Sequence, residues 1–117
     1  MVTIDDVRRL AATLPRAYEV LVRDQVKFRV GQIVFLSFSR DETLMGFGYP
    51  KEERAALVEA EPDKFLMPIK SDERYNWVRV RLSAIDVPEM HELVLDSWRM
   101  CVPKFVAREY LEATTSQ

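Results

Sequence analysis

The stretch that decides the fold is YEVLVRDQVKFRVGQIVFLSFSRDETLMGFGY, which occupies residues 18–49. Its apolar side chains recur at about every second position, the period of a β-strand with one buried face. Polar or glycine-containing breaks at 23–24, 31–32 and 40–42 divide the stretch into four strands joined by tight turns. Because strands so closely spaced in the chain pair as antiparallel hairpins, residues 18–49 predict a meandering antiparallel sheet.

A helix is predicted before this sheet. Thr3 and Asp6 have the spacing of a capping box, which supplies partners for the free N–H groups of a first helical turn. Apolar residues follow at helical spacing until Pro15 ends the pattern; they are Ile4, Val7, Leu10, Ala11 and Leu14. The resulting apolar stripe predicts that this helix covers one face of the sheet.

Helix and strand signals alternate after the sheet. Residues 50–60 predict a helix whose buried positions are Ala55, Leu57 and Val58. Residues 65–70 are apolar but contain Pro68, which fits an edge strand or a loop. Residues 77–82 (WVRVRL) form the clearest strand of the chain, with three inward positions: Val78, Val80 and Leu82.

The last third of the chain is predicted to be helical. Asp86 is the candidate N-cap, with Pro88 just inside and Glu89 three residues on. One apolar stripe follows, made of Met90, Leu93, Val94, Trp98, Cys101 and Val102. Pro103 separates this helix from a short terminal helix that is expected to end near Leu111, with a frayed tail over 112–117.

These elements predict one α+β domain spanning residues 1–117, with its ordered core over about 3–111. The architecture is two-layered, with a mostly antiparallel sheet and the helices on one face. The chain has 17 Lys plus Arg against 19 Asp plus Glu, a net charge of −2, so the charge total does not itself indicate a nucleic-acid partner. We find no signal peptide and no apolar run of the ~20 residues that a membrane helix needs. A single cysteine fits the cytoplasm.

Residues that carry catalysis are sparse. The only histidine, His91, and the only cysteine, Cys101, lie ten residues apart on a predicted helix, about 15 Å by its rise per residue, which is too far for a nucleophile–base pair. The three glycines make no phosphate loop, and Gly46-Phe47-Gly48 fits close packing against a neighbouring helix. We therefore predict no enzymatic activity, no metal and no cofactor, and we interpret Cys101 as an inert core thiol.

One set of basic and aromatic residues suggests a binding surface. Strand alternation places Lys27 and Arg29 opposite an apolar face, and it does the same for Arg79 and Arg81. If both strands bury the same face of one sheet, these four cations and Trp77 share the uncovered face, with Glu19 a candidate to lie among them. Cations beside an aromatic platform suit the backbone of single-stranded or duplex nucleic acid. The alternative interpretation is an ordinary solvated sheet face.

Several segments, taken in order, resemble the MmcQ/YjbR family. They are residues 75–82 (YNWVRVRL), the helix start at 86–89, residues 96–104 (DSWRMCVPK), residues 28–31 (FRVG) with the strand at 33–38, and residues 50–54 (PKEER). The resemblance spans residues 3–111. It implies a two-layer double-wing fold similar to that of secretion chaperones, and the family is commonly labelled DNA-binding from that architecture. No catalytic residue defines the family. Gln25-Val26-Lys27 stands where many members have His-Pro.

The basic residues and the family resemblance lead to two hypotheses for the function. The first is a non-enzymatic cytoplasmic binding protein that contacts nucleic acid through Lys27, Arg29, Trp77, Arg79 and Arg81. The alternative is a protein-interaction or chaperone-like module, bearing a protein partner or self-associating, that uses an uncovered apolar strip around Trp77 and Phe47. The two differ in their dependence on salt, which weakens the first kind of binding and leaves the second nearly unchanged.

Overall fold

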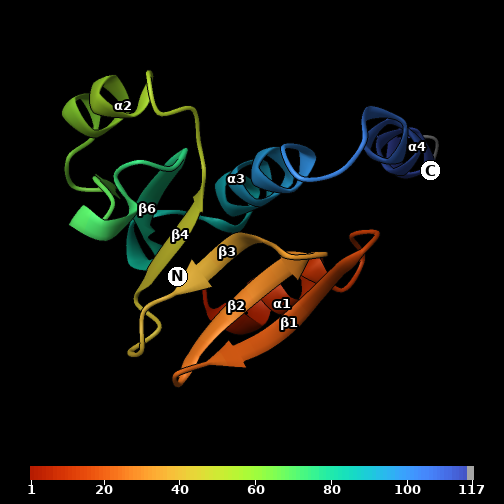
Figure 1. Ribbon diagram of the computed structural model, residues 1–117, viewed down its shortest axis with the longest axis horizontal. Coiled ribbons are helices and arrows are strands. Elements are labelled where there is room, and N and C mark those ends of the chain that lie inside the picture. Colours follow the sequence, from red (N-terminus) through yellow and green to blue (C-terminus); the bar gives the residue numbers. More distant parts are fainter. Residues whose placement is uncertain (116–117) are drawn as a thin grey trace.

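The computed structural model describes residues 1–115 (Figure 1). Within this range six strands form one sheet in the order β1-β2-β3-β4-β6-β5, and every neighbouring pair is antiparallel. The strands are β1 (Ala17–Val22), β2 (Gln25–Val30), β3 (Ile33–Phe38), β4 (Leu44–Gly48), β5 (Phe65–Leu66) and β6 (Trp77–Arg81). The helices are α1 (Ile4–Ala11), α2 (Arg54–Ala60), α3 (Val87–Arg99) and α4 (Lys104–Thr115), with short 3-10 turns at Lys70–Asp72 and Leu82–Ala84. The predicted α+β class and antiparallel sheet are confirmed.

The four strands predicted from residues 18–49 are β1 to β4. The first hairpin turns through Arg23 and Asp24, whose φ angles of 51° and 67° match the two left-handed positions of a tight hairpin turn. Gly31, with a φ of 59°, turns the chain between β2 and β3. The predicted edge strand at 65–70 is β5, which is only two residues long and ends two residues before the buried Pro68.

Helices α1 and α3 supply the second layer, on the face of the sheet that points away from the viewer at β1 and β2 (Figure 1). The capping box at the start of α1 is confirmed: the Thr3 side chain accepts from the Asp6 N–H, and the Thr3 N–H donates to the Asp6 carboxylate at 2.9 Å. The core between the layers is rich in aromatic and β-branched side chains, with these completely or almost completely buried: Val7, Phe35, Leu36, Phe38, Met45, Phe47, Val78, Val80, Met90, Val94 and Trp98.

The C-terminal helices follow the predicted signals with one difference. Asp86 caps α3 by accepting a hydrogen bond of 2.9 Å from the Glu89 N–H, as expected. The terminal helix α4 continues to Thr115 rather than ending near Leu111, and it packs the Tyr110 ring 5.2 Å from that of Trp98. Ser116 and Gln117, the end of the expected frayed tail, lie outside the described residues.

The helix predicted over 50–60 is shorter and buries a different residue. Helix α2 begins at Arg54, after a turn at 51–53. Ala55 is exposed and Leu57 and Val58 are only half-buried, so the predicted burial of Ala55 is wrong. Arg54 is the buried residue instead, at 7% exposure. A buried arginine needs hydrogen-bond partners, and its partners lie in a distant loop, which no local pattern reveals.

Candidate functional site

The sheet register places the predicted basic residues on one face. Lys27 lies opposite Ser37, Ser37 opposite Gly46, and Gly46 opposite Arg79, so the four form one row across β2, β3, β4 and β6. Three strand spacings separate Lys27 from Arg79, about 14 Å. Side chains two residues apart on a strand share a face, which adds Arg29, Trp77 and Arg81 to the same surface. All five predicted site residues therefore lie opposite the α1 layer; we call their surface the open face.

The cations on the open face differ in how free they are. Lys27 Nζ donates to Ser37 Oγ at 3.1 Å, and Arg81 is exposed. Arg79 donates from Nε and Nη2 to the carbonyl of Met67 at 3.0 and 2.8 Å, so it also anchors the segment after β5. Arg29 is half-buried, and its Nε has no acceptor among the described residues. Lys27 and Arg81 are thus the cations that can turn toward a ligand at the least structural cost.

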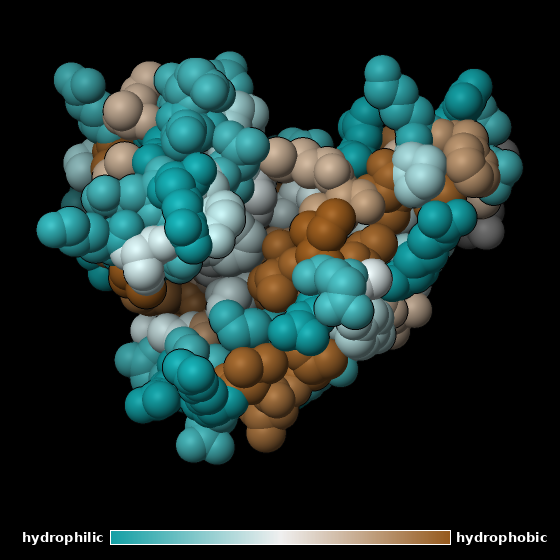
Figure 2. Space-filling view, viewed as in Figure 1, coloured by the Kyte–Doolittle hydropathy of each residue, from teal (hydrophilic) through white to brown (hydrophobic). Residues whose placement is uncertain are grey.

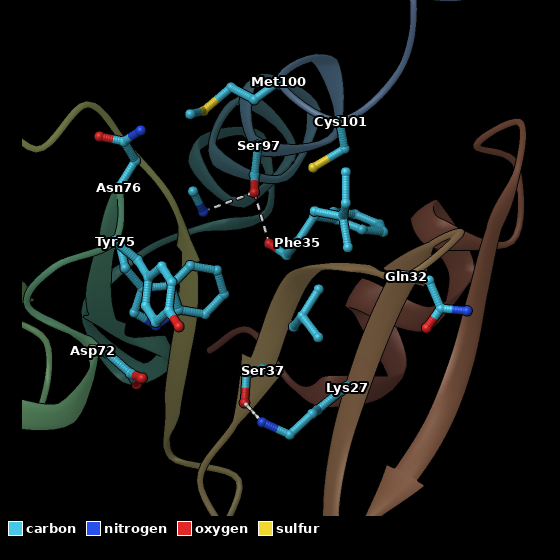
Figure 3. Close-up of a pocket in the computed structure, with 14 residues that line it drawn as sticks. Lys27, Gln32, Phe35, Ser37, Asp72, Tyr75, Asn76, Ser97, Met100 and Cys101 are labelled. Carbon is cyan, nitrogen blue, oxygen red and sulfur yellow. Dashed lines mark hydrogen bonds between the residues drawn. The ribbon is translucent and has the colours of Figure 1, made fainter.

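A cleft of about 550 Å³ is hollowed into the open face (Figure 3). Its floor carries Lys27 and Ser37, and one wall carries Trp77, Tyr75 and Asn76. The remaining lining residues come from β3 and its preceding turn, the end of β4, the 3-10 turn before Tyr75 and the end of α3: Gln32, Ile33, Val34, Phe35, Gly48, Asp72, Ser97, Met100 and Cys101. Figure 2 shows apolar side chains gathered in this hollow, with hydrophilic ones on the flanks. The cleft therefore combines an aromatic wall, an apolar interior and one cation, Lys27, on its floor.

The cleft exists because the sheet opens between β3 and β4. These strands pair only from Leu36–Phe47 to Phe38–Met45, and the next pair in the same register would be Phe35 with Gly48. The hydroxyl of Ser97 stands between those two residues: it donates to the Phe35 carbonyl at 2.6 Å and accepts from the Gly48 N–H at 2.8 Å (Figure 3). One buried side chain of α3 thus takes the place of a ladder hydrogen bond and holds the strands apart.

Buried Arg54 fixes the aromatic wall. Its guanidinium donates to the carbonyls of Glu73, Tyr75 and Trp77 at 2.6, 2.9 and 3.4 Å. Asn76 adds a second link, because its side-chain oxygen accepts from the Lys51 N–H at 3.0 Å. The loop that presents Tyr75 and Trp77 to the cleft is therefore tied to the start of α2.

The two glycines of β4 each make room for a side chain. A Cβ on Gly46 would lie 2.6 Å from the indole nitrogen of Trp77, so the indole rests directly on the Gly46 backbone. A Cβ on Gly48 would lie 3.0 Å from Ser97 Oγ and 3.3 Å from Met100 Sδ. The predicted packing against a helix is right for Gly48, whereas Gly46 packs against a neighbouring strand's tryptophan.

Both the sequence and the fold of the chain match known proteins. The family model described as YjbR matches residues 12–100 of the chain. The chain belongs to the YjbR family. A crystal structure of Deinococcus radiodurans protein DR2400, with the family-model domain DUF419, is similar to the chain with a TM-score of 0.76. The two share 20% identity over 94% of this chain and 88% of that one, a likeness that concerns the fold. No curated protein matches the chain.

Membership of the YjbR family confirms the predicted resemblance, but two details of the predicted site are wrong. Glu19 does not lie among the cations: it faces the α1 layer and accepts from Arg8 Nε and Nη2 at 3.0 Å each. The apolar strip expected around Trp77 and Phe47 is not one surface, because Phe47 is 1% exposed and faces the core. The acidic side chain that does line the cleft is Asp72.

The two reactive side chains of this YjbR-family chain lie apart. Cys101 is half-buried at the cleft, and burial raises the pKa of its thiol, which keeps it protonated near neutral pH. His91 lies in a separate groove with Leu10, Thr13 and Tyr110. Within residues 1–115 no group of three His, Cys, Asp or Glu side chains could hold a metal ion. In the same range no helix is both long and apolar enough to cross a bilayer.

Sequence reasoning missed Ser97, Arg54 and Ser37 as parts of the site. Ser97 carries the one usable signal, since a serine among Met90, Val94 and Trp98 on a buried helical stripe requires a hydrogen-bond partner. That signal indicates burial of a polar group without identifying its partners.

Proposed function

We propose that this chain is a non-enzymatic cytoplasmic protein that binds single-stranded nucleic acid along the open face. The observation that carries the proposal is the cross-strand register, which brings Lys27, Arg29, Arg79 and Arg81 onto one face beside Trp77. Cations aligned along a groove track a phosphate backbone, and an aromatic ring beside them stacks with a base of any sequence.

The cleft favours a single strand over a duplex. Trp77 is half-buried in the aromatic wall, and the Gly46 backbone supports one side of its indole. A base must enter the cleft to reach the indole, and paired bases inside a duplex cannot do so. Tyr75, which is 51% exposed, lies beside Trp77 and offers a second ring. Stacking of this kind contributes about 1–3 kcal/mol per base.

The charge of the whole chain limits the expected affinity for nucleic acid. The net charge is −2, and Asp72 lines the same cleft, so long-range attraction is weak and the local cations carry the binding. Four phosphate contacts on a single strand give a slope of log K against log salt of about −2.8. The affinity should therefore fall roughly 50-fold between about 50 and 200 mM salt.

The test uses fluorescence anisotropy of a labelled oligothymidylate at those two salt concentrations. We expect Lys27→Glu/Arg81→Glu to lower the affinity more than about tenfold and to at least halve the salt slope. Arg79 is left intact because its reversal would also release the Met67 carbonyl. Lys104→Glu/Arg108→Glu on α4 is the matched control, since both residues are exposed, lie outside the open face and change the net charge equally.

Two results would refute the proposal. One is no saturable binding of the oligonucleotide at the lower salt concentration. The other is an equal loss of affinity in both double variants, which would attribute binding to total charge rather than to the open face. Either result would favour the protein-interaction alternative.

A further inference from the structure

The outer edge of β1 is an unprotected strand edge. β1 is the end strand of the sheet and pairs with β2 without interruption from Ala17–Val30 to Val22–Gln25. Within residues 1–115 no strand pairs with its other side, and nothing lies beyond it in the view of Figure 1. The opposite end strand, β5, has two residues and is followed closely by Pro68, which blunts that edge. β1 has six residues and neither proline nor bulge, so it can accept another strand.

We propose that β1 pairs antiparallel with β1 of a second copy of this chain, with Val20 opposite Val20 of the second copy. This inference is independent of the proposed nucleic-acid binding. It rests on the backbone geometry of the edge and on the side chains that each register brings together.

The backbone limits the registers that can form. In a hairpin with a two-residue turn, the residues flanking the turn bond to each other, so Val22 and every second residue before it direct their backbone groups toward β2. Glu19 and Leu21 therefore direct their N–H and C=O groups outward, whereas the outward N–H of Ala17 already donates to the Leu14 carbonyl at 3.2 Å. A symmetric pairing must match outward residues with outward residues, and the two registers that pair five strand residues are centred on Glu19 or on Val20.

Side-chain chemistry selects between these two registers. Centring on Glu19 would set two carboxylates directly opposite each other, which is destabilising. Centring on Val20 sets valine against valine and Tyr18 against Val22 of the second copy, an aromatic and β-branched pair. It also sets Leu21 opposite Glu19, so the two copies of Glu19 lie on a diagonal instead of directly opposite each other, and each carboxylate keeps its own partner, Arg8. Leu21 is 69% exposed and Tyr18 43% exposed in the single chain, so pairing of the two copies would bury part of both side chains.

The paired sheet would be continuous across the two copies. A two-fold axis perpendicular to the sheet keeps both α1 layers on one side and both open faces on the other. Val20 lies opposite Lys27, and Tyr18 lies opposite Arg29, so the new contact would adjoin the cations of both copies. A contact of one strand against another is small, and we expect a weak, reversible dimer.

Sedimentation of the full chain from about 10 µM to about 1 mM tests for that dimer, because small interfaces dissociate in this range. Leu21→Pro removes an outward N–H without removing a bond to β2, and we expect it to be monomeric throughout. Leu21→Thr is the matched control, since it shortens the same side chain and keeps the N–H; it should still dimerise. Circular dichroism is used to check that both variants fold.

Disulfide trapping tests the register and does not depend on the proline variant. In a Cys101→Ser background, we expect Val20→Cys to form a covalent dimer on mild oxidation, because directly opposed Cα atoms lie about 4.5–5.5 Å apart. Glu19→Cys in the same background should not, because its counterpart in the second copy lies diagonally beyond about 7 Å.

Four results would overturn the inference. The first is a monomer at every concentration with no covalent dimer of Val20→Cys. The second is a dimer that Leu21→Pro leaves unchanged, which would indicate another face. The third is preferential trapping of Glu19→Cys, which would indicate the other register. The fourth is a monomer that binds a foreign extended peptide at this edge, which would make the partner a different protein.

Discussion

At the scale of single residues, Ser97 determines whether the cleft exists. Its hydroxyl satisfies the Phe35 carbonyl and the Gly48 N–H, which would be ladder partners if β3 and β4 continued in register. The Ser97 side chain is fully buried and Phe35 is 1% exposed, whereas Gly48 is half-buried beside the cleft. A serine is small enough to fit against Gly48, and it both donates and accepts.

We expect Ser97→Ala to lower the free energy of unfolding by about 1–3 kcal/mol, because it leaves the buried Phe35 carbonyl and the half-buried Gly48 N–H without their partner. Denaturant unfolding measures the change. Ser83→Ala, at an exposed serine, is the control and should alter stability by less than about 0.5 kcal/mol. Equal stability of Ser97→Ala and the parent would show that β3 and β4 can close the gap themselves.

At the scale of elements, the cap of α1 makes stability depend on pH. Hydrogen bonds from Thr3, first its N–H and then its hydroxyl, lower the pKa of the Asp6 carboxyl below its ordinary value of 3.8, and Arg9 adds to the effect. The folded chain therefore keeps Asp6 ionised to a lower pH than the unfolded chain does. Its contribution is complete above the unfolded-state pKa and is lost as pH falls through the folded-state pKa.

We accordingly expect Asp6→Asn to lower the melting temperature at pH 7 and to flatten the fall in melting temperature between about pH 5 and pH 2. Asp5→Asn is a suitable control: Asp5 lies in the first turn of the same helix and pairs with Arg8, but it takes no part in the capping box. If both variants titrate alike, the dependence would belong to the helix dipole rather than to the Thr3–Asp6 cap.

The elements were predictable where their signals are local. The cap of α1, the turns at 23–24 and 31–32 and the alternation in 77–82 each act within a few residues, and each is present as expected. Alternation also placed the four cations on one face, because the period of a strand is two wherever its partner lies.

The parts of the site that sequence could not predict depend on contacts between distant segments. Ser97 meets Phe35 from 62 residues away and Gly48 from 49 residues away. Arg54 reaches carbonyls 19 to 23 residues ahead of it. Glu19 was misplaced for the same reason: its partner Arg8 belongs to another element, and only the packing of α1 on the sheet brings the two together.

At the scale of the whole molecule, stability is distributed unevenly around the cleft. Helix α3 has four buried residues and a capped start. Helix α2 has seven residues, no side-chain cap and a single buried residue, Arg54. The free energy of a local opening follows the buried surface that the opening exposes, so α2 should open far more readily than α3. Because Arg54 also holds the carbonyls of Glu73, Tyr75 and Trp77, the aromatic wall should loosen with it.

Hydrogen exchange measures this coupling. We expect the amides of α2 to exchange at least about tenfold faster than those of α3. Arg54→Lys should raise exchange further in α2 and at Trp77 while leaving α1 unchanged, because one ammonium cannot reach three carbonyls as a planar guanidinium does. Arg9→Lys, at an exposed arginine of α1, is the control for replacing a guanidinium group by an ammonium group. A uniform rise over all elements in Arg54→Lys would instead show that α2 and its wall unfold only with the whole domain.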